Sequence, residues 1–334
     1  MKPENILEIK DLKVKFPVTG GLFLKKIAEV KAVDGVNLEL KKGETLGLVG
    51  ESGCGKSTIG KAVINILKFS SPDVDITGQV NIRTDDGVVD ILSLSNNEMR
   101  KYRGLIQMIF QDPYSSLNAR LSVGQIIEEP LLYHTKMNKS ERMERVAWLL
   151  EKVGLQAEQS KRYPHEFSGG QRQRIGIARA LATNPKIIIA DEPVSALDVS
   201  IQAQVINLMQ ELQSEFDLSL LFVAHDLSVV EHISSRIAVM YLGNIVEIGP
   251  GYDIYHNPIH PYSRALLSAV PLPNPKRKDK ERVILKGDVP TPMNKPSGCG
   301  FRTRCPIAKK ECADFVPPLE LKKTDHFAAC PYVQ

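Results

Sequence analysis

The chain has 334 residues, of which 43% are hydrophobic and 25% charged, the ordinary mix of a soluble globular protein. This length predicts about two domains. The formal net charge of +4 excludes a strongly charged disordered tail protein and gives no electrostatic reason to expect nucleic acid as a partner. No stretch approaches the roughly 18 apolar residues of a membrane helix. The opening sequence MKPENILEIK lacks the apolar core of a signal peptide, so we expect a cytosolic protein that does not span a membrane.

Segments typical of strands and helices alternate along the first three quarters of the chain, which predicts an α/β fold with parallel strands. Strands are expected at three short hydrophobic segments, Thr45–Val49, Ile187–Ala190 and Leu218–Ala224. Helices are expected over Lys56–Leu67 and Ser140–Leu155, where apolar residues recur at helical spacing. The second helix carries an apolar stripe that we expect to face the core, formed by Met143, Val146, Ala147 and Leu150.

Residues 50–57, GESGCGKS, match the phosphate-loop pattern G-x-x-x-x-G-K-[ST] and lie between an expected strand and an expected helix. Glycines let the backbone wrap around phosphate oxygens, and the helix N-terminus attracts the anion. Lys56 can reach the terminal phosphates of a nucleotide, and the Ser57 hydroxyl can ligate Mg²⁺. The predicted nucleotide-binding residues here are Gly50, Glu51, Ser52, Gly53, Cys54, Gly55, Lys56, Ser57 and Thr58. We do not expect the Cys54 side chain itself to bind phosphate.

Two acidic residues follow the hydrophobic segment Lys186–Ala190. A phosphate loop needs a carboxylate for its metal ion and a group that positions the attacking water. Asp191 is predicted to hold Mg²⁺, usually through water, and Glu192 to polarise the attacking water. An acidic pair after a core strand can equally be a surface feature, but the phosphate loop favours the catalytic interpretation.

Residues 167–172, FSGGQR, resemble the signature motif of ATP-binding cassette (ABC) ATPases. Ser168 can cap a helix that runs from Gly169 toward Ala182. The resemblance implies that this segment faces the γ-phosphate of ATP bound by the other subunit of a dimer. The residues that it assigns to nucleotide binding are Ser168, Gly169, Gly170 and Gln171.

The resemblance assigns roles to three more polar residues. Gln111 is similar to the Q-loop glutamine, which contacts Mg²⁺ and the water and senses the transmembrane partner. Asp198 resembles the D-loop aspartate that communicates across the dimer, and His225 the switch histidine at the γ-phosphate. Phe16 is the candidate for the aromatic ring that stacks on adenine. An insertion over about residues 17–29 leaves Phe23, Ile27 or simple core packing of Phe16 as alternatives.

Within the ABC family, segments such as HPYSRALL at 260–267 resemble the dipeptide and oligopeptide importer group, in the second of its two ATPase subunit types. This implies a heterodimer with a related ATPase at the cytoplasmic face of the cell membrane. The pair would dock on two transmembrane permeases fed by an external substrate-binding protein. Importers of nickel and other small solutes share these features and are an alternative. A soluble, non-transport ABC ATPase is the rival class, although such proteins usually carry two cassettes or a long coiled-coil insertion.

Four of the five cysteines lie in the last 36 residues, after a proline-rich segment whose run KRKDKER at 276–282 predicts a linker. Such a small lobe often needs a covalent or metal staple, which in a reducing cytosol is a metal or iron–sulfur site. Their spacings are wider than in a common zinc knuckle, and four cysteines are the ligands that [4Fe–4S] clusters use. The predicted cluster ligands are Cys299, Cys305, Cys312 and Cys330. The alternatives to a cluster are a zinc ion, or cysteines that are free or linked by disulfides. His260 and His326 are possible extra ligands, but we expect both to be solvated.

These observations predict an α/β phosphate-loop ATPase core with an antiparallel β edge, a helical subdomain at about 116–182 and a small cysteine-rich C-terminal lobe. The nucleotide-binding domain is expected over residues 1–260 and the extension over 261–334. The predicted catalytic residues are Glu192, His225 and Gln111. The predicted Mg²⁺ ligands are Ser57, Gln111 and Asp191. The expected cofactors are ATP, Mg²⁺ and a [4Fe–4S] cluster.

Overall fold

The computed structural model describes residues 4–20, 25–269, 285 and 287–333, and these residues form two compact units. The first unit contains residues 4–6, 40–44 and 82–223, and the second contains the remaining described residues. Each unit is therefore assembled from segments that lie far apart in the sequence.

The first unit contains three parallel strands: β6 (Ile106–Ile109), β7 (Ile187–Asp191) and β8 (Ser219–Ala224). Ile187 is aligned with Ile106 on one side and with Ser219 on the other. Every residue of β7 and β8 is buried, as expected for continuous apolar strands covered on both faces. The strand predicted at residues 187–190 is confirmed, and the one predicted from Leu218 begins one residue later.

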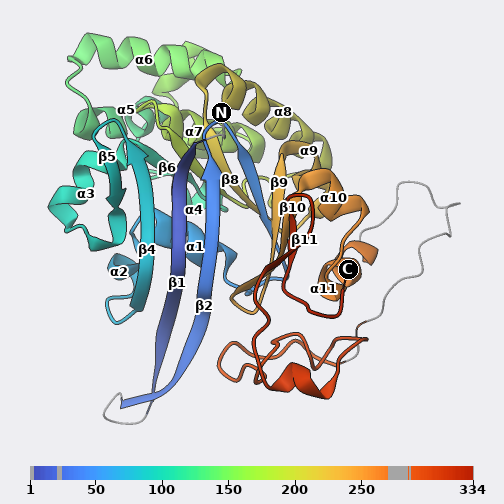
Figure 1. Cartoon of the computed structure of the whole chain (residues 1–334). Coiled ribbons are helices and arrows are strands. Elements are labelled where there is room, and N and C mark those ends of the chain that lie inside the picture. The colour runs from blue at the N-terminus through green and yellow to red at the C-terminus, as the bar shows by residue number, and fades with distance from the viewer. Residues whose placement is uncertain (1–3, 21–24, 270–284, 286, 334) are drawn as a thin grey trace, which may run out of the picture. The chain divides into compact units, whose positions relative to one another are not determined.

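The remaining elements of the first unit are mostly helices, drawn in turquoise to olive in Figure 1. They are α3 (Asn96–Arg103), α4 (Pro113–Ser116), α5 (Val123–His134), α6 (Lys139–Lys152), α7 (Gly169–Leu181) and α8 (Val199–Phe216). A short strand β5 (Gly87–Asp90) and single 3₁₀ turns at Ile91–Ser93, Ala157–Lys161 and Pro164–Glu166 complete the unit. The α3, α5, α6 and α7 helices each begin with a reciprocal capping box, in which a Ser or Asn pairs with a Glu or Gln three residues later. Local sequence therefore sets where these helices start.

The apolar stripe predicted on α6 is correct except at its first member. Val146 and Leu150 are buried, whereas Met143 is 60% exposed. Leu149 and Val153 are also buried, so the covered face lies one turn closer to the C-terminal end of the helix than the sequence pattern suggested.

The second unit contains most of a β layer in which β1 (Asn5–Gly20) lies between β2 (Lys25–Lys41) and β4 (Asp75–Thr84). β1 and β2 run side by side in opposite directions (Figure 1). The predicted insertion at residues 17–29 lengthens these two strands, while residues 21–24, including Phe23, lie outside the described part.

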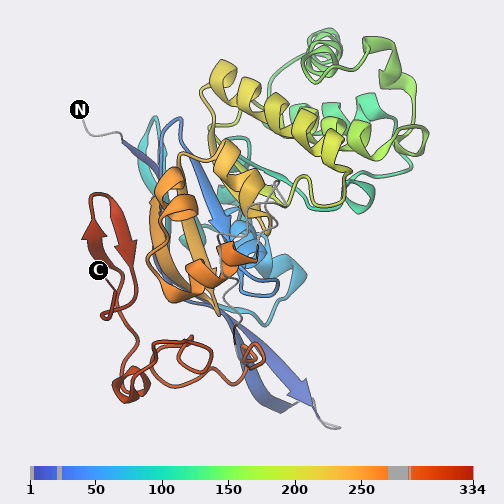
Figure 2. The ribbon, with the colours of Figure 1, turned by 90° about the vertical axis from the view of Figure 1, so that its right-hand side faces the viewer.

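A second set of strands in this unit leads from the phosphate loop to the C-terminal lobe. β3 (Thr45–Val49) has the bounds predicted for this strand from the sequence. It pairs in parallel with β9 (Arg236–Tyr241). β9 pairs antiparallel with β10 (Asn244–Pro250), and β10 pairs antiparallel with β12 (His326–Ala328). β11 (Glu320–Lys323) closes a small hairpin with β12, drawn in red in Figure 2. These last two strands were not predicted from the sequence.

The helices of the second unit are short. They are α1 (Lys56–Val63), α2 (Leu67–Ser70), α9 (Leu227–Ile233), α10 (Gly251–His256) and α11 (Pro261–Ser268), with a 3₁₀ turn at Lys310–Ala313. The single helix predicted over residues 56–67 is wrong at its end, because Asn65 adopts a left-handed conformation with φ of 52° that separates α1 from α2. The predicted linker at residues 276–282 lies outside the described residues. In the part of the chain that is described, no helix combines the length and apolarity needed to cross a membrane.

Candidate nucleotide site and cysteine lobe

The phosphate-loop segment connects the buried strand β3 to the first turn of α1. Gly55 has φ of +111°, and a Cβ built on it would lie 2.1 Å from the carbonyl oxygen of Ala32. A Cβ on Gly50 would lie 2.2 Å from the carbonyl oxygen of Met240. These positions therefore require glycine, both for backbone conformation and because neighbouring backbone passes so close.

The Lys56 side chain is buried and folds back over the loop. Its ammonium donates hydrogen bonds to the carbonyl oxygens of Gly50, at 2.8 Å, and Glu51, at 3.1 Å. Burial raises the pKa of the Cys54 thiol, which packs inside the same loop as a neutral group. The loop thus holds the Lys56 cation against its own backbone, and Ser57 and Thr58 follow it in the first turn of α1.

The two predicted catalytic side chains of the first unit meet directly. β7 ends on Asp191, whose side chain is buried, and Glu192 follows it with a left-handed φ of +45°. Such a conformation is strained for a non-glycine residue and is common at functional sites. The Glu192 backbone N–H donates to the Val223 carbonyl oxygen at 2.9 Å. The Gln111 amide donates to the Glu192 carboxylate, also at 2.9 Å.

The signature segment forms the first turn of α7. Ser168 is exposed and caps the helix by accepting a hydrogen bond from the Gln171 backbone N–H at 3.3 Å. Gly170 is packed against α8, since a Cβ there would lie 2.5 Å from a methyl carbon of Ile201. Asp198 stands at the N-cap position of α8. Ser168, Gly169, Gly170 and Asp198 therefore lie at the first turns of two packed helices.

Arg172 holds the signature turn in place. Its guanidinium stacks 3.6 Å from the centre of the Tyr114 ring, and its Nε donates to the Pro164 carbonyl oxygen at 2.8 Å. Sequence reasoning did not single out this residue. The cation–π contact and the hydrogen bond together tie Tyr114 and Pro164 to the first turn of α7.

His225 and Phe16 lie in the second unit. His225 follows β8 and is exposed, next to Asp226, which caps α9. Phe16 is half-buried on β1. Ile27, the described alternative for the adenine contact, is 68% exposed.

The four C-terminal cysteines line one small cavity together with Phe301, Phe315 and Pro331. All are free thiols, so the disulfide alternative finds no support in the described structure. The backbone N–H of Lys309 donates to the Cys312 sulfur at 3.4 Å. Burial raises the pKa of the Cys305 thiol to about 11 and also raises that of Cys299. Among the residues that the structure describes, no three or more His, Cys, Asp or Glu side chains are grouped as around a single metal ion, so neither a cluster nor zinc is shown.

The expectation that His260 and His326 are solvated is wrong. Both are almost completely buried around Glu247, a fully buried residue of β10. The Glu247 carboxylate accepts hydrogen bonds from the backbone N–H groups of Ile259, at 2.6 Å, and His260, at 3.0 Å, and lies 2.7 Å from Nε2 of His326. Burial lowers the pKa of His260 to about 4, so its ring is neutral, and Nδ1 accepts a bond from the Tyr262 backbone N–H.

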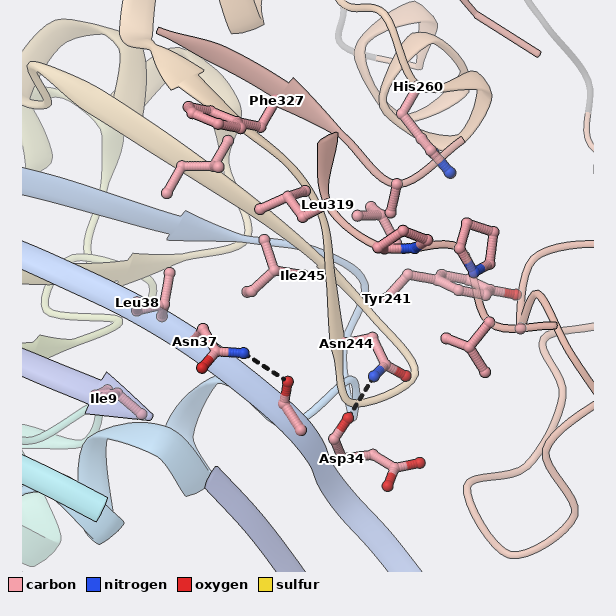
Figure 3. Close-up of a pocket in the computed structure, with 18 of the residues that line it drawn as sticks. Ile9, Asp34, Asn37, Leu38, Tyr241, Asn244, Ile245, His260, Leu319 and Phe327 are labelled. Carbon is pink, nitrogen blue, oxygen red and sulfur yellow. Dashed lines mark hydrogen bonds between the residues drawn. The ribbon is translucent and has the colours of Figure 1, made fainter. Parts of the chain in front are cut away.

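A cavity of about 690 Å³ in the second unit lies between β1, β2, β10 and the C-terminal lobe (Figure 3). Its labelled lining includes Leu38, Asn244, Ile245 and Phe327, and the amide of Asn244 donates to the carbonyl oxygen of Asp34. None of the predicted nucleotide-binding residues lines it. It is therefore distinct from the predicted ATP site.

Comparison with known proteins matches both parts of the chain. Residues 33–195 fit the family model described as "ABC transporter", and residues 246–312 fit "Oligopeptide/dipeptide transporter, C-terminal region". The chain is 54% identical to the oligopeptide transport ATP-binding protein AppF of Bacillus subtilis, covering 98% of this chain and 97% of that protein. It is 56% identical to OppF of Escherichia coli, covering 94% of this chain and 92% of that protein.

Solved structures support the same fold. The ATP-binding cassette MJ0796, in a dimeric post-hydrolysis state bound to ADP and Pi, is 29% identical with a TM-score of 0.60 and covers 73% of this chain and 98% of its own. The fold is that of a phosphate-loop ABC ATPase with an antiparallel β subdomain. The chain belongs to the family of ATP-binding subunits of oligopeptide ABC importers.

Proposed function

We propose that this chain hydrolyses ATP to drive the uptake of dipeptides and oligopeptides across the cytoplasmic membrane. The supporting observation is similarity along nearly the whole chain to proteins named for oligopeptide transport, including the separate C-terminal region. The chain would act at the cytoplasmic face of the membrane as a peripheral subunit. It would pair with a related ATPase and dock on two permeases that receive substrate from an external binding protein. Residues 1–260 would form the nucleotide-binding domain, with a helical subdomain at about 116–182, and residues 261–334 the extension.

The residue roles follow from the chemistry of phosphoryl transfer. Mg²⁺ prefers hard oxygen ligands such as those of hydroxyl, amide and carboxylate groups. In nucleotide sites, Mg²⁺ is commonly bound by one or two carboxylates together with the substrate phosphates. Ser57, Gln111 and Asp191 supply this donor set, and the buried carboxylate of Asp191 suits a cation. Bound Mg²⁺ would neutralise charge on the phosphates.

The chain's own groups would carry out the remaining steps. The phosphate loop and Lys56 would hold the phosphates of ATP, and Glu192 would orient and polarise water for in-line attack on the γ-phosphate. The Gln111 amide, bonded to Glu192, would hold that carboxylate in position. His225 would contact the γ-phosphate, and Phe16 would stack on adenine. Ser168, Gly169, Gly170, Gln171 and Asp198 would serve the nucleotide bound by the partner ATPase.

We also propose that the four C-terminal cysteines bind a [4Fe–4S] cluster. Their chemistry fits this group, because [4Fe–4S] clusters use four thiolates and all four cysteines line one cavity. The Cys312 sulfur accepts a backbone N–H bond, the kind of contact that stabilises thiolates in clusters.

The cluster proposal is tested by purifying the full-length protein without oxygen. We expect about four iron and four acid-labile sulfide per chain, as the cluster formula requires. Cys305→Ser should lower both, whereas Cys54→Ser should leave the iron content unchanged. Zinc in place of iron, or iron retained after Cys305→Ser, would refute the proposal.

The transport proposal is tested in the organism that encodes the chain. Deleting the gene should abolish uptake of a labelled tripeptide, and a plasmid copy should restore it. A copy carrying Lys56→Ala should fail to restore uptake, because the phosphate loop then lacks its only lysine. Unchanged tripeptide uptake with loss of ⁶³Ni²⁺ uptake would instead identify a nickel importer.

A further inference from the structure

The cysteine lobe contacts the phosphate loop through one arginine. Arg304, the residue before Cys305, places its guanidinium against the carboxylate of Glu51, the second residue of the phosphate-loop motif. The distances from its two terminal nitrogens to the carboxylate oxygens range from 3.0 to 3.3 Å. Only 9% of the Arg304 side chain and 27% of the Glu51 side chain are exposed. A paired, largely buried arginine–carboxylate contact of this kind is both directional and sensitive to loss of either partner.

Aromatic packing reinforces this contact. The hydroxyl of Tyr262, on α11, accepts a hydrogen bond from the Glu51 backbone N–H at 2.9 Å. The Tyr262 ring packs against Tyr241 and against Phe301, which lies in the cysteine loop (residues 297–312). Burial raises the pKa of Tyr262, so its hydroxyl remains neutral. Both the backbone and the side chain of Glu51 are therefore held by residues outside the phosphate loop.

A second buried ion pair fastens the segment before the cysteine loop to the same unit. The Lys295 ammonium lies 3.0 Å from the Asp34 carboxylate, with 14% and 30% of these side chains exposed. Asp34 is two residues after Ala32, whose carbonyl oxygen packs against Gly55 of the loop. Two ion pairs thus connect the C-terminal lobe to the rest of its unit, and the Arg304–Glu51 pair reaches the phosphate loop itself.

The negative charge of Glu51 links the Arg304–Glu51 pair to the binding of phosphate. A phosphate loop binds anions through backbone N–H groups, a lysine and a helix N-terminus. A carboxylate in that loop opposes the binding of a nucleotide phosphate unless a cation neutralises it. Arg304 is the cation that pairs with it in the described structure.

We propose that Arg304 is a positioning residue for nucleotide binding: it neutralises Glu51 and thereby makes the affinity of the phosphate loop depend on the docked cysteine lobe. The proposal rests on the proposed function, because it assumes that this loop binds nucleotide. It extends that function by giving the C-terminal lobe a defined effect on the ATP site, independent of what the cysteines bind.

The test is a titration of the full-length protein with MgADP. We expect Arg304→Gln to weaken binding about five- to tenfold, at the lower end of the range for a coupling between two sites. In the Glu51→Gln background the same replacement should change affinity by less than about twofold, because no charge remains to neutralise. Arg304→Lys, which keeps the charge, should lie between wild type and Arg304→Gln. A merely structural role would make Arg304→Gln equally harmful in both backgrounds.

Arg302→Gln is the matched control, because Arg302 belongs to the same loop and, in the described part of the chain, its guanidinium donates to the carbonyl oxygen and hydroxyl of Ser297 and not to Glu51. We expect it to bind MgADP as wild type does. Wild-type affinity in Arg304→Gln, or equal losses in both Glu51 backgrounds, would overturn the proposal. If the wild type and Lys56→Ala bind MgADP equally poorly, the proposed function fails instead. Should Arg304→Gln fold poorly, Arg304→Lys takes its place in both Glu51 backgrounds, and an equal loss in the two would again overturn the proposal.

Discussion

Replacing Glu192 with Gln will leave MgATP binding within about twofold of wild type and lower steady-state hydrolysis by a factor of about 10² to 10⁴, the range of a lost general base. The amide keeps the shape of the side chain and can still bond to Gln111, which now lies 2.9 Å from the carboxylate. It lacks the negative charge needed to polarise water. Binding and turnover should therefore separate.

The measurement is ATP hydrolysis by the assembled transporter, compared with nucleotide binding by the same preparation. Glu211→Gln is the matched control, since Glu211 is an exposed glutamate on α8 of the same unit. It should hydrolyse ATP at the wild-type rate. Hydrolysis by Glu192→Gln at a rate close to wild type would remove Glu192 from its assigned role.

Replacing Glu247 with Ala will destabilise the attachment of the C-terminal strands by about 3–5 kcal/mol, as expected when one partner of a buried charged network is removed. The change leaves His326 and two backbone N–H groups buried without their acceptor. These three donors belong to β12 and to the segment that leads into α11. Loss of the carboxylate therefore affects both the last strand and the segment around His260.

Hydrogen–deuterium exchange of β10 and β12 measures this effect locally. If the free energy of local opening falls by about 3 kcal/mol, the amides of these strands should exchange more than a hundredfold faster. Glu320→Ala on the neighbouring strand β11 is the matched control, because its ion pair with Lys322 is half-exposed and surface pairs contribute at most about 1 kcal/mol. Exchange in Glu247→Ala at the wild-type rate would show that the network does not hold the lobe.

The sequence by itself determined the family, the phosphate loop and several helix starts. These features depend on residues that lie close together in the chain: the glycine spacing before Lys56, the Ser168 and Gln171 pair that caps α7, and the unbroken apolar run of β7. Local backbone hydrogen bonding and strand burial follow directly from such patterns. Because each motif consists of neighbouring residues, the motifs could be recognised one after another along the chain. Their separations in space were not needed.

Contacts between distant residues were decided only by the tertiary structure. Gln111 and Glu192 are 81 residues apart and Glu51 and Arg304 are 253 apart, so no spacing rule could pair them. The two histidines were predicted to be solvated because a lone histidine usually is, but pairing of β12 with β10 buries them around Glu247. Charged and polar side chains can be buried only where the fold supplies partners, and those partners come from remote segments that local patterns do not reveal.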